Sequence, residues 1–234
     1  MGLVFKFKKF EVDQAGCAMK INTDGVLLGA IATQQQPAHI LDIGTGTGVI
    51  AMMLAQRFPD SVIDAVEIDE SAAIAAGKNF TNSPFSNQLS IYHTPVELYT
   101  AAVKYDLIVS NPPYFVNDLK STEKRKEIAR HADEDFFDLL LIKIGGILNE
   151  KGLFWLILPV KQAEKVIVNA VLQRLFPSRI IHVFSDASKD EFRQIICLGF
   201  VNTPAVHEKV YIYEETNVYT MQYKEILKDF LLAF

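Results

Sequence analysis

The chain has 234 residues and half of them are hydrophobic, which suits one large domain with a continuous core. Its formal net charge of −5 argues against a protein that binds nucleic acid regardless of sequence, although a local basic patch is compatible with this balance. No apolar run approaches the roughly 20 residues that span a bilayer, and the first residues lack the apolar core of a signal peptide, so we expect a cytoplasmic protein without membrane contact.

Short apolar runs alternate with helical periods through the central part of the chain. The predicted strands are His39–Ile43, Val62–Glu67, Leu89–His93, Asp106–Val109 and Leu153–Leu158. The predicted helices between them are Val49–Phe58, Glu70–Phe80 and about Asp135–Leu148, the last with Asp133 as its N-cap. This alternation is typical of an α/β protein with a doubly wound, mostly parallel sheet and right-handed crossovers.

Three β-rich runs follow, at Arg179–Phe184, Gln194–Phe200 and Val210–Tyr213. Because no long helix separates the last two, we expect a closing antiparallel hairpin on one side of a seven-stranded sheet. The tail Tyr219–Phe234 is predicted to form an amphipathic helix or a partly helical cap. We therefore expect a single domain over residues 1–234, with an N-terminal extension over 1–37 and the sheet-forming core over 38–234.

A glycine-rich loop follows the first predicted core strand, with Gly44, Gly46 and Gly48 at alternate positions. Glycine permits positive φ and lets a ligand approach the backbone closely. A dinucleotide-binding loop would place its third glycine at position 49, where Val49 stands, and the lysine of a phosphate-binding Walker loop is absent. Asp42 would repel a pyrophosphate but suits a ligand with an ammonium group. The alternative is a tight turn with no ligand.

Glu67 ends the second predicted core strand, about 20 residues beyond the glycine loop, where an acidic side chain accepts hydrogen bonds from ribose hydroxyls. The alternative is an exposed loop acid. Asp69 is a candidate N-cap for the helix that follows. Asp42, the three glycines and Glu67 together fit a nucleoside that has an amino-acid tail and no phosphates. S-adenosylmethionine is such a molecule.

The segment Asn111-Pro112-Pro113-Tyr114 directly follows the fourth predicted core strand. Two consecutive prolines cannot continue a strand, so the chain must leave the sheet there in a stiff bend. The carboxyl edge of an open α/β sheet is where ligands bind, and a planar amino group fits between the Asn111 oxygen and the Pro112 carbonyl, with its ring stacked on Tyr114. The alternative is a turn that only ends the strand.

With these residues placed, the chain resembles the class I S-adenosylmethionine-dependent methyltransferases, and among them the amino-methyltransferases with an Asn-Pro-Pro-Tyr motif. Further blocks resemble the bacterial tRNA(Val) adenine-N6-methyltransferases, namely Phe5–Phe10, Cys17–Lys20, Thr23–Ala30 and Ser121–His131. The resemblance implies a Rossmann-like fold, S-adenosylmethionine as cofactor and a tRNA substrate. It also implies methylation at N6 of the adenosine 3′ of the anticodon.

The resemblance implies a set of cofactor-binding residues: Thr23, Asp24, Asp42, Gly44, Gly46, Gly48, Glu67, Ile68 and Val96. Thr23 and Asp24 also precede an apolar helix, so they could instead be its N-cap or face the target base. Many relatives have an acid near position 96 that binds the adenine amino group, and this chain has Val96 there. Glu97 or a backbone carbonyl are the alternatives for that contact.

The catalytic residues implied are Asn111, Pro112, Pro113 and Tyr114, and Phe115 would add an apolar wall or simply belong to the core. The expected RNA contacts are Lys20, Phe115, Lys120, Lys124, Arg125, Lys126 and Arg130, and a second basic cluster stands at Lys6, Lys8 and Lys9. The alternative is a set of solvated charged faces.

Other functions compete with this interpretation. A protein glutamine-N5-methyltransferase could use the same Asn-Pro-Pro-Tyr clamp, but such enzymes carry a sizeable helical domain before the glycine loop. A guanine-N2-methyltransferase and a non-catalytic cofactor-binding RNA assembly factor are further alternatives. Cys17 and Cys197 lie far apart, and His93 and His131 have no partner at ligand spacing, so we expect reduced thiols and no metal. We expect a monomer.

Overall fold

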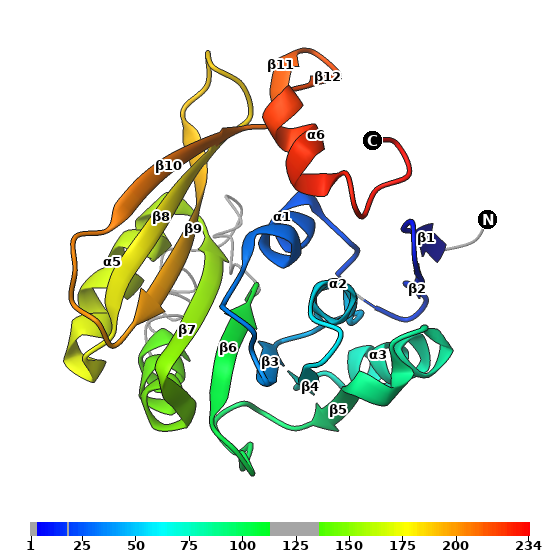
Figure 1. The fold of residues 1–234 in the computed structure, drawn as a ribbon, viewed down its shortest axis with the longest axis vertical. Coiled ribbons are helices and arrows are strands. Elements are labelled where there is room, and N and C mark those ends of the chain that lie inside the picture. The colour runs from blue at the N-terminus through cyan, green and yellow to red at the C-terminus, as the bar shows by residue number, and fades with distance from the viewer. Residues whose placement is uncertain (1–3, 18, 113–135) are drawn as a thin grey trace, which may run out of the picture.

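The computed structural model describes residues 4–17, 19–112 and 136–234. Its centre is an eight-stranded sheet with the order β10-β8-β9-β7-β6-β3-β4-β5 (Figure 1). The strands of this sheet are β3 (His39–Ile43), β4 (Val62–Glu67), β5 (Leu89–His93), β6 (Tyr105–Ser110), β7 (Leu148–Leu158), β8 (Phe176–Phe184), β9 (Glu191–Gly199) and β10 (Val206–Tyr211). The parallel strands β3, β4, β5, β6 and β7 form the doubly wound core that the sequence predicts.

Helices cover both faces of the sheet, each over its own hydrophobic cluster (Figure 1). The helices on one face are α1 (Thr23–Ile31), α2 (Val49–Arg57), α3 (Glu70–Asn82) and α6 (Met221–Leu227). On the other face lie α5 (Val160–Ala170) and a helix that covers residues 136–147. Two short 3-10 helices complete the set, η1 (Ser86–Gln88) and η2 (Val171–Gln173). No helix of the described residues is long and apolar enough to cross a membrane.

The helix and strand bounds agree closely with the pattern of the sequence. β3, β4 and β5 have the predicted bounds, and Asp69 caps α3 by accepting a hydrogen bond from Ala72 N at 2.8 Å. β7 begins at Leu148 rather than Leu153, because its polar stretch 149–152 passes through a register shift against β6. Asp133 and Asp135 lie outside the described residues.

The prediction of a closing hairpin was wrong in its partners. The antiparallel hairpin is β8–β9, with β9 inserted between β7 and β8, while β10 pairs parallel to β8 at the edge and brings the sheet to eight strands rather than seven. Burial gives the reason: residues 194–199 of β9 are all buried, as an inner strand requires, whereas β10 buries only Val210. A short loop joins β8 to β9, and a crossover is needed to reach the outer side of β8.

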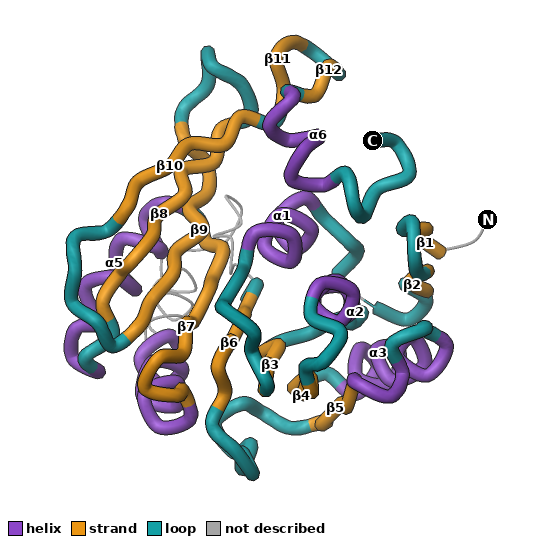
Figure 2. Tube along the Cα trace, viewed as in Figure 1, coloured by secondary structure: helices purple, strands orange, loops and turns teal. Residues whose placement is uncertain are grey.

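The N-terminal extension packs onto the core instead of standing apart. β1 (Val4–Lys6) and β2 (Glu11–Asp13) form an antiparallel pair, and Phe7, Phe10 and Val12 join the hydrophobic cluster under α1 and α2. The tail is a partly helical cap: β11 (Tyr213–Glu215) and β12 (Val218–Tyr219) precede α6, and Figure 2 shows mostly loop beyond that helix. Lys8 N donates to Phe230 O at 2.8 Å, which joins the extension to this cap.

Candidate active site

The glycine turn between β3 and α2 depends on positive φ at all three of its glycines, which is +70° at Gly44, +58° at Gly46 and +84° at Gly48. A Cβ at Gly48 would come within 2.4 Å of the Phe80 ring, so the packing of α3 requires glycine there. At Gly44 and Gly46 a Cβ would meet no described atom within 4 Å. These two positions therefore face open space, which is what a ligand lying along the turn needs.

Asp42 lies beneath the turn, fully buried at 0% exposure. Its Oδ2 accepts hydrogen bonds from Thr45 Oγ1 at 2.6 Å and Ala51 N at 3.1 Å, while Oδ1 has no hydrogen-bond partner among the described residues. Burial raises the pKa of this carboxyl to about 7, the two hydrogen bonds lower it, and the charge of Glu67 adds to the rise. Asp42 thus supports the turn from within.

Glu67, at the end of β4, joins two loops through its carboxylate. Oε2 accepts a hydrogen bond from Gly46 N at 2.8 Å, and Oε1 accepts one from Asp69 N at 2.9 Å. The residue is nearly buried beside the glycine turn, as expected of an acid that meets ribose hydroxyls. Ile68 follows it with 67% of its surface exposed, so an apolar side chain stands open next to this acid.

The side chain of Val96, a residue that the resemblance includes in the cofactor site, lies in the hydrophobic core. Its side chain is buried in the hydrophobic cluster that also contains Tyr99. The reason is a local turn, in which Tyr99 N donates to the carbonyls of Pro95 and Val96 and draws this stretch against the sheet. The Val96 side chain therefore faces the core, and Glu97 is the exposed residue of the pair.

The end of β6 brings the Asn111 corner beside the glycine turn. Ser110 pairs with Ile43 across the two strands, and Ser110 Oγ donates to Ile43 O at 2.9 Å. Asn111 and Gly44 are the next residues of their strands, and neighbouring strands lie about 4.8 Å apart, so the two motifs share one edge of the sheet. Asn111 is half-buried and Pro112 is buried.

Several predicted site residues lie outside the described residues. They are Pro113, Tyr114, Phe115, Lys120, Lys124, Arg125, Lys126 and Arg130. The predicted block Ser121–His131 falls there as well.

A pocket of about 490 Å³ opens next to the Asn111 corner. Five separate stretches of the chain line it, with the residues Met19, Asn22, Thr23, Asp24, Asn111, Pro112, Ser185, Phe192, Arg193, Ile212 and Tyr213. Thr23 and Asp24 therefore lie with Asn111, while no glycine of the turn is among the described lining residues. Arg193, Phe192 and Tyr213 were not foreseen, because no spacing in the sequence connects them to the corner.

The first turn of α1 forms one wall of this pocket. The N-cap is Asn22 rather than Thr23 or Asp24, and its Oδ1 accepts from Gly25 N at 2.9 Å. Asp24 is buried, and its Oδ2 accepts from Arg193 Nε at 2.7 Å. This ion pair joins α1 to β9 across 169 positions of sequence.

The basic residues of the extension are engaged within the structure. Lys20 Nζ donates to Gln14 O at 2.7 Å, and Lys20 is not among the described residues that line the pocket. Lys6 pairs with Glu11 at 2.8 Å. Lys8 Nζ donates to Lys228 O and, at 2.6 Å, to Phe234 O. In this second basic cluster, Lys8 therefore ties the extension to the tail and Lys6 joins β1 to β2.

The two thiols are buried, and neither is among the described residues that line the pocket. Burial raises the pKa of Cys17, and it raises that of Cys197 to about 11, so neither is poised as a thiolate nucleophile. Within the described ranges, no group of three or more His, Cys, Asp or Glu side chains could hold a metal ion.

The residues around the glycine turn fit a nucleoside cofactor with a cationic tail. Open space flanks Gly44 and Gly46, Glu67 offers carboxylate oxygens at the strand end, and Ile68 offers an exposed apolar surface. The unpartnered Oδ1 of Asp42 adds a buried acceptor beneath the turn.

Comparisons with known proteins agree with this arrangement. A family model described as the methyltransferase small domain matches residues 20–175. A Pedobacter heparinus protein named tRNA1(Val) (adenine(37)-N6)-methyltransferase is 56% identical over 98% of both chains, and one of the same name from Bacteroides thetaiotaomicron is 38% identical over 97% of both. A solved structure of a predicted O-methyltransferase from Agrobacterium tumefaciens has a TM-score of 0.69 at 17% identity, and the match covers 88% of this chain and 96% of that one. This last likeness shows the Rossmann-like class I methyltransferase fold.

Proposed function

The chain belongs to the tRNA1(Val) (adenine(37)-N6)-methyltransferase family, and from this premise we propose that it methylates the exocyclic N6 of adenosine 37 in tRNA1(Val). The observation that carries the proposal is the pairing of β3 with β6, which puts the Asn111 corner next to the glycine turn. This pairing supports a site in which an acceptor for an amino group and a cradle for a methyl donor would share one edge of the sheet.

The methyl donor is S-adenosylmethionine, which supplies a methyl group on a sulfonium centre. We propose that the turn at Gly44 and Gly46 lets it approach the backbone, and that Glu67 accepts hydrogen bonds from its ribose hydroxyls. Ile68 would pack against its base, and Asp42 would hold the turn in shape from beneath. Gly48 contributes by allowing α3 to pack against the turn.

Asn111 and Pro112 would make the target amine reactive. The lone pair of adenine N6 is delocalised into the ring, so the amine is a weak nucleophile. Two acceptors, the Asn111 amide oxygen and the Pro112 carbonyl, can bind its two hydrogens and favour a more tetrahedral nitrogen. Positioning then supplies most of the rate, and the amine becomes acidic once methylated, so water can take the proton. The base must first leave its stack.

Several expectations from the resemblance remain proposals. Tyr114 would stack on the target base and Pro113 would stiffen the corner. RNA contacts are assigned to Lys20, Phe115, Lys120, Lys124, Arg125, Lys126 and Arg130. We also propose that the enzyme is a cytoplasmic monomer, and gel filtration with light scattering tests its mass in solution.

Methyl transfer to unmodified valine tRNA tests the proposed function. With tritiated S-adenosylmethionine, we expect label in the tRNA, and nucleoside analysis should assign it to N6-methyladenosine. Asn111→Ala should lower the rate about 100-fold or more, with cofactor affinity nearly unchanged. Asn202→Ala, at an exposed loop residue, is the matched control and should leave the rate unchanged.

Two outcomes would contradict the proposal. Label in a protein glutamine would favour the glutamine-N5-methyltransferase alternative. Cofactor binding without transfer to any tRNA would favour a non-catalytic binding protein.

A further inference from the structure

The first turn of α1 touches the catalytic corner at a point where it carries no side chain. A Cβ at Gly25 would lie 3.5 Å from Asn111 Nδ2 and 3.6 Å from the capping oxygen of Asn22. The backbone of this turn therefore lies directly against the carboxamide. Nδ2 is the atom of the Asn111 carboxamide that meets this turn.

The neighbouring residue, Asp24, anchors this turn to β9. Its side chain is only 10% exposed, and that of its partner Arg193 is 24% exposed. A charge-assisted hydrogen bond sheltered in this way is short, directional and little screened by salt. The pair therefore limits how far the turn can move relative to the sheet.

Arg193 is itself held in place from its own strand. Its NH1 donates to Phe192 O at 2.9 Å, and its guanidinium carbon lies 5.3 Å from the centre of the Phe192 ring. The anchor for α1 is thus a fixed group rather than a flexible surface side chain. Both members of the pair line the same pocket as Asn111.

We propose that Asp24 and Arg193 are positioning residues for methyl transfer, and that their ion pair holds the first turn of α1 against the carboxamide of Asn111. Neither side chain is assigned a contact with the reacting nitrogen. The inference rests on the proposed role of Asn111, and it moves Asp24 from the cofactor site to the target-base pocket. Losing the pair should slow transfer while cofactor affinity stays the same.

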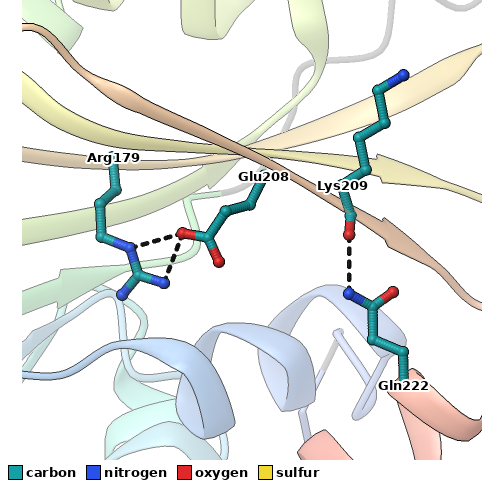
Figure 3. A network of polar contacts seen from close by, with 4 residues as sticks. All are labelled: Arg179, Glu208, Lys209 and Gln222. Atoms are coloured by element: carbon teal, nitrogen blue, oxygen red, sulfur yellow. Dashed lines mark hydrogen bonds and ion pairs between the residues drawn. The ribbon is translucent and has the colours of Figure 1, made fainter.

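The sheet offers a matched control pair. Arg179 on β8 donates from Nε at 2.9 Å and from NH2 at 2.7 Å to Glu208 Oε1 on β10 (Figure 3). Neither residue is among the described residues that line the pocket. Arg179→Gln therefore removes a more exposed arginine–carboxylate pair, with side chains 35% and 43% exposed, and leaves the described pocket lining intact.

The first test follows the Asn111 side chain by NMR in protein labelled with ¹⁵N-asparagine. Loss of one side-chain amide signal in Asn111→Ser assigns it. We expect Arg193→Gln and Asp24→Asn each to shift and broaden this signal. The change in the double variant should be no larger than the change in either single variant. Arg179→Gln should leave the signal unchanged. A sharp, unshifted signal in both single variants would overturn the proposal. This readout needs no methyl transfer, so it stands even if the proposed function fails.

The second test separates catalysis from binding. Arg193→Gln and Asp24→Asn should each lower kcat about 10- to 100-fold, the double variant should match the singles, and the Kd for the cofactor should change less than about twofold. Arg193→Lys should recover part of the rate, because a lysine can still pair with Asp24. Arg179→Gln should stay within about twofold of the parent rate.

Other results have distinct meanings. A raised Kd for the cofactor with kcat unchanged would return Asp24 to the cofactor site and overturn the proposal. If the fold-losses in kcat of the two single variants multiply in the double variant, the two residues act separately. That result would also overturn the proposal. An unaltered parent enzyme that never methylates tRNA would instead overturn the proposed function, and the NMR result would then decide on positioning.

Discussion

The glycine turn and the pocket beside Asn111 occupy neighbouring positions on one sheet edge but are built differently. Asp42 binds Thr45 and Ala51 within its own strand–turn–helix unit, and Glu67 binds Gly46 and Asp69 at the next strand end. The pocket is assembled instead from stretches between Met19 and Tyr213. The glycine turn is therefore encoded in short motifs, and the pocket exists only once the sheet has formed.

The two regions also bury an aspartate in different ways. Asp24 pairs with the cation of Arg193, whereas the hydrogen-bond partners of Asp42 among the described residues are the hydroxyl of Thr45 and the amide of Ala51. A buried carboxylate without a cation is costly in its charged form. The glycine turn therefore carries a pH-dependent weakness at Asp42.

The largest expected effect is the pH dependence of Asp42→Asn. The pKa of Asp42 is raised to about 7 in the folded state, so the stability contributed by the neutral carboxyl is present at low pH and is lost as pH rises toward 7. Relative to the parent, the variant should gain up to about 4 kcal/mol of unfolding free energy between about pH 4 and pH 7. Urea denaturation across this range measures the gain. Parallel pH profiles for the two proteins would contradict the expectation.

Two glycine substitutions separate folding from ligand binding within the turn. Gly48→Ala should lower the free energy of unfolding by about 3 kcal/mol, because the new methyl group meets Phe80 and the residue has a left-handed backbone. Gly46→Ala should lose only about 1 kcal/mol but weaken cofactor binding about tenfold or more, since its methyl group would enter the open space. Thermal denaturation and calorimetric titration measure the two effects. Equal stability losses would contradict this division of roles.

The smallest effect concerns a contact that joins the glycine turn to α3 and to the N-terminal extension. Asn79 is buried on α3, where its Nδ2 donates to Thr47 O at 2.9 Å and Asp13 O at 3.0 Å, and its Oδ1 accepts from Asp13 N at 2.9 Å. Asn79→Ala should lower the free energy of unfolding by about 2 kcal/mol, while Asn82→Ala, exposed on the same helix, should change it by less than about 0.5 kcal/mol. Equal losses of unfolding free energy in the two variants would mean that the hydrogen bonds of Asn79 to the turn and the extension do not stabilise the fold.

The sequence predicts those parts of the fold that local chemistry determines. The bounds of β3, β4 and β5 follow from apolar runs between turn residues, and the start of α2 follows from the glycine turn. The pairing of β10 with β8 could not be predicted, because the position of a strand at the edge or inside a sheet depends on its packing against neighbouring strands. The burial of Val96 follows from a local turn that no periodicity revealed.

The candidate site likewise has residues that local sequence identifies and residues that only the folded sheet brings together. Spacing and chemistry are enough to identify the three glycines, Asp42, Glu67 and Asn111 as candidate site residues. Arg193 does not, since it stands in a β-rich run and becomes relevant only when β9 inserts beside β7. Asn22 was missed as the N-cap because Thr23 and Asp24 are equally good capping residues.

The join between the extension and the tail has a consequence for how the protein emerges from the ribosome. Phe7 bridges to Leu231, and Lys8 reaches a carbonyl 220 residues further along the chain. These early residues are translated long before their partners exist. The contacts between the extension and the tail can therefore form only after the tail has been made, whereas Phe10 can already pack against Phe85.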